Sequence, residues 1–172
     1  RSTQSRSSAA SDVYKRQLID NPVFHIRHRK RETPDRINSL LNLAHYLIFS
    51  RVNATIRAVG LNPYLGFLHE PDNRYESLAA DIQEPFRAQT EGAVIKILNL
   101  RVIKENDFTE SEKGCYLKKE AIKTFINSFE AELERKPRKD VPSLKDQIYY
   151  QIVRVKQYML EGQHLIFYRW KG

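Results

Sequence analysis

The chain has 172 residues, a formal net charge of +8, 41% hydrophobic residues and a single cysteine. This length is typical of one domain, and the apolar fraction suffices for a sizeable core, which excludes a wholly disordered chain. Because Cys115 stands alone, a disulfide framework and a cysteine-based zinc site are excluded, and we expect an intracellular protein. No apolar stretch reaches the ~20 residues that a membrane span needs, so a membrane protein is excluded as well.

The positive charge is concentrated near the start of the sequence. Residues 1–36 contain 9 Lys and Arg against 4 Asp and Glu, and residues 37–172 contain 20 against 17. A basic segment of this kind binds phosphate or an acidic partner, or is solvated, so it favours nucleic acid only weakly. Residues 1–17 are rich in Ser, Arg and Gln and lack apolar periodicity. We interpret them as a disordered or artefactual leader that precedes a folded domain of residues 18–172.

The first helix predicted from the sequence is the longest. Thr33 as cap, Pro34 at the first helical position and Asp35 in the first turn form a helix-start combination. Apolar residues then recur at three- and four-residue steps until Gly60, which is typical of a helix terminator. Residues 61–76 contain prolines and a glycine, and we expect an irregular loop there.

Three further helical regions follow this loop. Ser77 opens the first of them, which Pro85 interrupts. Residues 104–116 are predicted to be a polar linker, and helices are predicted over residues 117–135 and 143–162. No segment shows sustained strand alternation, so we expect an all-α, multi-helix domain with an irregular, histidine-bearing loop between the first and second helices. The aromatic residues of the last two helices are expected in the core rather than as base-stacking platforms: Phe125, Phe129, Tyr149, Tyr150 and Tyr158.

Two carboxylates and one imidazole form the candidate site. Asp81 and Glu84 are three residues apart in a predicted helix, which predicts that they share one face about one turn apart. His69 lies on the preceding loop, which can bring its ring to the first turn of that helix. Mostly oxygen ligands of this kind suit Mg²⁺ or Mn²⁺. On spacing alone, a solvated acidic face and a surface histidine are the commoner interpretation.

The sequence motifs around these residues provide evidence beyond their spacing. A G-x-x-P-x-x-G-x-x-H turn is present as Gly60, Pro63, Gly66 and His69. A serine-leucine cap and a D-x-x-E-P-F-R helix follow it, as Ser77, Leu78, Asp81, Glu84, Pro85, Phe86 and Arg87. Together they resemble the central signature of the CRISPR-associated integrase family, the DNA endonucleases that insert new spacers during adaptation. The preceding RHRKRETPDRINSLLNLAHYLI and the later GCYLKKEAIKTFINSFEAEL also resemble this family, so the resemblance covers about residues 22–170.

The resemblance implies a function and its parts. It implies a divalent-metal-dependent DNA endonuclease and integrase, in which His69, Asp81 and Glu84 hold Mg²⁺ or Mn²⁺ while a 3′-hydroxyl of foreign DNA attacks a phosphodiester of the repeat array. It implies double-stranded DNA and a small ferredoxin-like adaptation protein as partners, a homodimer in the full-length family, and a prokaryotic cytoplasm. A further ligand glutamate and a β-rich N-terminal domain of the family have no match here. We therefore interpret the chain as a C-terminal part, truncated on its N-terminal side.

Cationic residues complete the expected DNA-binding set. We expect phosphate contacts from a basic arm, with a solvated arm as the alternative: Arg27, Arg29, Lys30 and Arg31. Arg87 contacts DNA or neutralises the carboxylates when metal is absent, and its spacing from Glu84 favours the second role. A non-catalytic helical DNA-binding or assembly module, with this truncated chain inactive, is the alternative to the enzyme.

Overall fold

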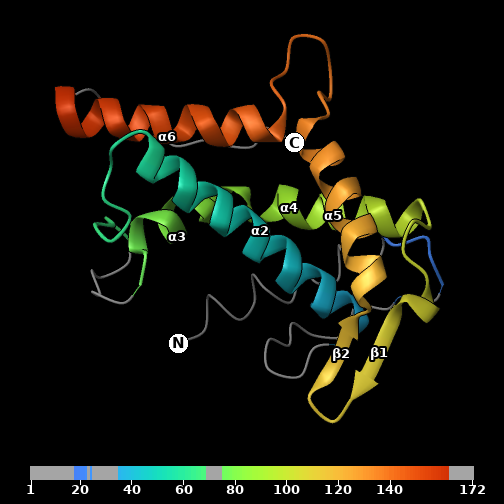
Figure 1. Ribbon diagram of the computed structural model, residues 1–172. Helices are drawn as coiled ribbons and strands as arrows, with labels where there is room; N and C mark the ends of the chain where they lie inside the picture. The colour runs from blue at the N-terminus through green and yellow to red at the C-terminus, as the bar shows by residue number, and fades with distance from the viewer. Residues whose placement is uncertain (1–17, 23, 25–34, 69–74, 163–172) are drawn as a thin grey trace, which may run out of the picture. The chain divides into compact units, whose positions relative to one another are not determined.

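The computed structural model describes residues 18–22, 24, 35–68 and 75–162 (Figure 1). Along these residues the elements are α2 (Arg36–Ala58), α3 (Ser77–Gln83), the 3₁₀ turn η1 (Glu84–Phe86), α4 (Arg87–Asn99), the 3₁₀ turn η2 (Glu105–Asp107), β1 (Phe108–Ser111), β2 (Gly114–Leu117), α5 (Lys119–Glu134) and α6 (Leu144–Glu161). The fold is thus mostly helical, as predicted. No helix in the described part of the chain is both long enough and apolar enough to cross a bilayer.

The chain forms two compact units. The first comprises Arg1–Ala44 and Glu91–Glu132, and the second comprises His45–Thr90 and Leu133–Gly172. Each unit therefore combines segments that are distant in the sequence. The candidate carboxylates Asp81 and Glu84 both belong to the second unit.

Both ends of α2 have a local cause. The carboxylate of Asp35 accepts the backbone N–H of Asn38 at 2.8 Å, which is the contact of an N-cap residue. The sequence predicted Thr33 as cap and Asp35 inside the first turn, so the helix begins later than predicted; Thr33 lies outside the described residues. At the other end Gly60 adopts a φ of +83°, and the Leu61 N–H donates to the carbonyl of Ile56 at 3.0 Å, which ends the helix as predicted.

The core of the first unit consists of apolar side chains from its helices and its hairpin. Phe125 and Phe129 are fully buried, and their rings stack with centroids 5.8 Å apart, which confirms their predicted place in the core. Buried Asn21 donates its side-chain N–H to the carbonyl of Leu98 at 3.0 Å. Burying an amide without a hydrogen-bond partner would cost free energy. The bond to Leu98 avoids this cost and holds the segment of residues 18–22 against the end of α4.

A two-stranded antiparallel hairpin replaces the predicted polar linker. β1 and β2 pair from Phe108 opposite Leu117 to Ser111 opposite Gly114. Phe108, Cys115 and Leu117 are buried whereas Tyr116 is exposed, so the pattern has the two-residue period of strands. Each strand has four residues, which is too short for alternation to stand out in the sequence. The sequence predicted that the next helix begins at Leu117. Instead, Leu117 ends β2, and α5 begins at Lys119.

The second unit packs α3 and α6 around apolar side chains, with Phe86 and Ile152 fully buried. Its helix ends follow the sequence closely. Pro85 lies in η1, between α3 and α4, which confirms the predicted interruption. Ser143 caps α6 by accepting the N–H of Asp146, and Gly162 closes the helix in the left-handed region.

The tyrosines of α6 contradict the prediction that they lie in the core. Tyr149 and Tyr150 are each 50% exposed, and Tyr158 is 45% exposed. The buried face of α6 is instead formed by Ile148, Gln151, Ile152 and Val155. Helical spacing alone did not predict which of two apolar stripes faces inward, because tyrosine packs acceptably on either side.

Candidate active site

Asp81 is a fully buried carboxylate in the middle of α3. Its exposed fraction is 0%, and its neighbours Leu78, Ala80 and Ile82 are buried as well. Because α3 is short and nearly all of its residues are buried, the carboxylate of this aspartate lies away from water. A buried carboxylate needs hydrogen-bond donors to offset its loss of hydration.

The donors that meet this carboxylate are backbone N–H groups of the preceding loop. Asp81 Oδ2 accepts the N–H of Phe67 at 2.6 Å and the N–H of Leu68 at 2.9 Å. Beside it, Ser77 Oγ accepts the N–H of Gly66 at 2.9 Å and donates to the carbonyl of Tyr64 at 2.7 Å. We call this set of contacts from Ser77 and Asp81 to residues 64–68 the Asp81 clasp. Bonds to a charged acceptor are stronger than neutral ones, so the clasp fixes the loop to α3.

Gly66 is a glycine because the clasp leaves no room for a side chain. A Cβ atom at this position would lie 2.7 Å from Asp81 Oδ2 and 2.8 Å from both Cβ and Oγ of Ser77. The absence of a side chain therefore permits the close approach of backbone to carboxylate. This gives a physical reason for the second glycine of the sequence motif.

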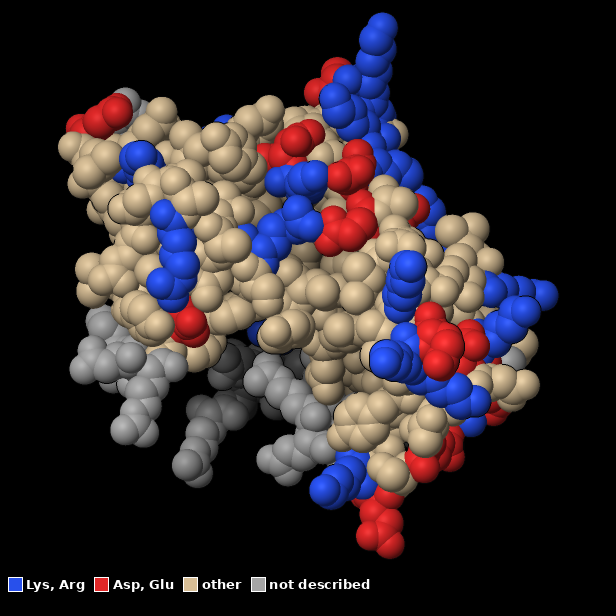
Figure 2. All heavy atoms as spheres, in the orientation of Figure 1, with Lys and Arg blue, Asp and Glu red and all other residues tan. Residues whose placement is uncertain are grey.

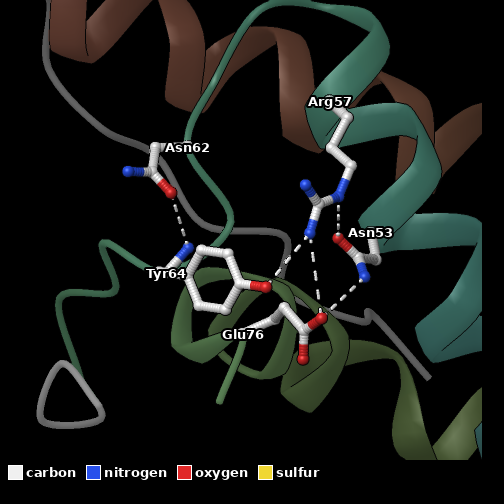
Figure 3. A network of polar contacts seen from close by, with 5 residues as sticks. All are labelled: Asn53, Arg57, Asn62, Tyr64 and Glu76. Atoms are coloured by element: carbon white, nitrogen blue, oxygen red, sulfur yellow. Dashed lines mark hydrogen bonds and ion pairs between the residues drawn. The ribbon is translucent and has the colours of Figure 1, made fainter. Parts of the chain in front are cut away.

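A second network fixes the two ends of the same connection to α2 (Figure 3). Glu76, just before α3, accepts a hydrogen bond from Asn53 at 3.3 Å and lies 3.8 Å from a terminal guanidinium nitrogen of Arg57. Arg57 also donates to Asn53 at 3.1 Å and to the Tyr64 hydroxyl at 3.5 Å. The backbone N–H of Tyr64 in turn donates to Asn62 at 3.0 Å. One arginine of α2 thus contacts both the start and the end of the loop that carries the histidine.

His69 itself lies outside the described residues, so the predicted grouping of the imidazole with the two carboxylates stays a prediction. The described chain reaches Leu68, whose N–H is bonded to Asp81. The segment that leads into His69 is therefore attached beside one of the two predicted carboxylates. Within residues 18–22, 24, 35–68 and 75–162 there is no group of three or more His, Cys, Asp and Glu side chains arranged for a metal ion.

Glu84 has an environment opposite to that of Asp81. It opens η1, its side chain is 56% exposed, and it forms an ion pair with Arg87 at 3.0 Å. This pair confirms the contact that the sequence predicted between Arg87 and Glu84. The prediction that Asp81 and Glu84 share one face stays a prediction: α3 ends at Gln83 and Glu84 opens a 3₁₀ turn, while the backbone keeps right-handed helical angles at both residues. The two carboxylates thus differ in burial, since Asp81 is buried and Glu84 is exposed.

The basic arm lies outside the described residues: Arg27, Arg29, Lys30 and Arg31. Sequence reasoning also missed Arg57, Glu76 and Ser77 as parts of the loop's support. Of these only Ser77 gave a signal, as a helix start, but its hydroxyl bonds to the loop and Glu76 occupies the cap position.

Comparison with known proteins supplies a family. The family model described as "CRISPR associated protein Cas1" matches residues 9–131. A curated relative, the CRISPR-associated endonuclease Cas1 3 of Thermus thermophilus, is 33% identical over 161 residues, which are 91% of this chain and 48% of that protein. The chain thus spans about half the length of this relative.

Solved structures share the fold. A CAS1 protein from Thermotoga maritima matches with a TM-score of 0.82 at 23% identity, over 97% of this chain and 53% of the other. A casposase bound to integration product matches with a TM-score of 0.78 at 23% identity, over 93% and 47%. A partial Cas6-RT-Cas1–Cas2 complex matches with a TM-score of 0.78 at 22% identity, over 96% and 52%.

Proposed function

Because the chain belongs to the Cas1 family of CRISPR-associated proteins, we propose that it is the helical catalytic part of a DNA endonuclease and integrase that inserts foreign DNA into a repeat array. A curated relative named as a CRISPR-associated endonuclease supports this activity. The observation that carries the proposal is the Asp81 clasp, which attaches the backbone leading into His69 to the helix that bears Asp81.

In this proposal His69, Asp81 and Glu84 hold Mg²⁺ or Mn²⁺, which their nitrogen and oxygen donors suit. The bound cation supplies charge stabilisation to the phosphodiester oxygens during attack by a 3′-hydroxyl or by water. Glu84 is the readiest ligand, because its carboxylate is exposed and only a surface ion pair holds it. Asp81 has a second role as well, since its Oδ2 atom positions the loop that leads to His69.

In the same proposal, Arg87 neutralises the charge of Glu84. Its guanidinium lies 3.0 Å from Glu84 and balances that carboxylate when no cation is present. The arm residues, by contrast, are proposed to bind phosphate oxygens, for which guanidinium groups have the matching geometry: Arg27, Arg29, Lys30 and Arg31. The proposed partners are double-stranded DNA and a small ferredoxin-like adaptation protein, with a homodimer of the whole protein. A relative solved in a Cas1–Cas2 complex supports a protein partner.

Binding of Mn²⁺ tests the proposal independently of catalysis. The amplitude of the free Mn²⁺ electron paramagnetic resonance signal is titrated with the purified chain and with Glu84→Gln. We expect the substitution to weaken Mn²⁺ binding by more than about 100-fold, the upper end of the effect of residues that only support a ligand. Glu112→Gln, an exposed glutamate at the turn of the hairpin, is the matched control and should bind as the unaltered chain does.

Cleavage and strand transfer of a labelled duplex in Mn²⁺ are measured in parallel, beside a form extended upstream toward the length of the relatives. Activity that Glu84→Gln abolishes in either form supports catalysis. DNA binding without Mn²⁺ binding would overturn the metal-dependent enzyme and favour the non-catalytic binding module.

A further inference from the structure

The connection between α5 and α6 carries the densest group of cations in the described part of the chain. Arg135, Lys136, Arg138 and Lys139 fall within five positions, and Asp140 follows them. All residues from 135 to 140, which we call the basic connection, are exposed. None of them takes part in the Asp81 clasp or in the network around Arg57.

The basic connection accounts for the charge excess of residues 37–172. Residues 37–172 contain 20 Lys and Arg against 17 Asp and Glu, of which the connection contributes 4 against 1. The remainder of residues 37–172 is therefore balanced, at 16 against 16. A net charge of +3 gathered on six consecutive residues produces a local positive potential that an evenly mixed surface lacks.

The local structure keeps three of these cations, Lys136, Arg138 and Lys139, out of ion pairs with the described residues. α5 ends at Glu134, and Pro137 prevents the helix from continuing through the connection. Figure 2 displays lysine and arginine side chains gathered where this connection projects. Glu134 is engaged elsewhere, because it accepts a hydrogen bond from Lys145 at 2.7 Å. Lys136, Arg138 and Lys139 form no ion pair with any residue that the structure describes.

We propose that the basic connection is a second DNA contact of this chain, which binds the phosphate backbone outside the site of Asp81 and Glu84. The proposal rests on the proposed function for the identity of the polyanion. A protein partner fits less well, since protein interfaces are depleted in lysine and depend on buried apolar or aromatic anchors. The connection offers only Pro137 of that kind. Its chemistry of exposed guanidinium and ammonium groups instead matches sequence-independent contact with phosphates.

The salt dependence of duplex binding tests this contact without metal or catalysis. Fluorescence anisotropy of a labelled DNA duplex is measured in EDTA between about 50 and about 200 mM NaCl, and the slope of log K against log salt counts phosphate contacts at about 0.9 each. Replacement of Lys136, Arg138 and Lys139 by Gln should flatten the slope by up to about 2.7. Over that fourfold range of salt, affinity should then fall about 40-fold less than in the unaltered chain.

A matched control separates a contact from general charge. Replacement of three exposed lysines by Gln lowers the net charge equally at another surface: Lys113, Lys119 and Lys123. This control should change the slope by less than one contact, about 0.9. Lys136→Arg with Lys139→Arg should keep the full slope, which shows that charge and not side-chain length matters.

Three results would overturn the proposal: an unchanged slope in the triple variant of the connection, an equal loss in the control, or a chain that binds no duplex. An unchanged slope would favour an acidic protein surface as the partner. Because no metal is present, these results leave the Mn²⁺ and cleavage tests of the proposed function unaffected, so the two can fail separately.

Discussion

Substitution of Gly66 by alanine tests whether the Asp81 clasp holds the loop. The new Cβ would lie 2.7 Å from Asp81 Oδ2 and 2.8 Å from Ser77 Oγ, so the loop must retreat from α3. This retreat lengthens the bonds to Asp81 from Phe67 at 2.6 Å and from Leu68 at 2.9 Å. Loss of both, at about 1.5 kcal/mol for each bond to a charged group, predicts a destabilisation of about 3 kcal/mol.

Urea unfolding followed by circular dichroism measures this change. We expect a lower midpoint with an unchanged m value, since the folded state is strained while the surface exposed on unfolding stays the same. In thermal unfolding the same free energy corresponds to a decrease in Tm of about 6–12 °C for a chain of this size.

Gly92→Ala is the internal control for this experiment. Gly92 lies in α4, and a Cβ there would meet nothing within 4 Å. Alanine should stabilise this helix by about 0.5–1 kcal/mol. If Gly66→Ala leaves the free energy of unfolding within about 0.5 kcal/mol of the unaltered chain, as surface substitutions usually do, the argument for the clasp is refuted.

Three further predictions follow from buried and paired groups. Asp81→Asn keeps an oxygen for the loop N–H groups, so it should unfold at a higher urea concentration than Asp81→Ala; equal midpoints would contradict the hydrogen bonds. The hydrogen bond and charge of Lys145 lower the pKa of Glu134 below its ordinary 4.5. The pair therefore stabilises the fold above pH 4.5, and this stabilisation is lost as the pH falls through the lowered pKa. Carbon-13 NMR titration should find that pKa returned toward 4.5 in Lys145→Gln. Burial raises the pKa of the Cys115 thiol above its ordinary 9.0, so its stabilisation is present below that value and lost as pH rises. Cys115→Ala should therefore lose less stability than the unaltered chain in urea unfolding at increasing alkaline pH, and parallel curves would refute this.

Much of the helical framework follows from local signals in the sequence. Gly60 and Gly162 end helices where a left-handed residue is needed, Ser143 caps α6, and Pro85 separates α3 from α4. Each of these effects depends on one residue and its immediate neighbours along the chain. These features can therefore be predicted from the sequence, and the ion pair of Glu84 with Arg87 can be predicted for the same reason.

The candidate site was only partly predictable, because its arrangement depends on contacts between segments. Spacing placed Asp81 and Glu84 in one helical region, but their difference in exposure depends on which other segments pack against α3. The donors to Asp81 are backbone groups of residues 67 and 68, and no side-chain pattern reveals such donors. The hairpin was missed for a related reason, since four-residue strands gain their stability from pairing and burial rather than from local preference.

The Asp81 clasp grips peptide groups, and this has a consequence for how the loop can diversify. Phe67 and Leu68 contribute N–H groups to the carboxylate, while the two residues are 38% and 68% exposed. Every residue except proline carries that N–H. The attachment of the loop therefore does not depend on which side chains occupy these two positions. Substitutions there can change the exposed surface next to the histidine in the sequence while the hydrogen bonds to Asp81 are kept. In contrast, a substitution at Gly66 or Asp81 would disturb the hydrogen bonds that attach the loop.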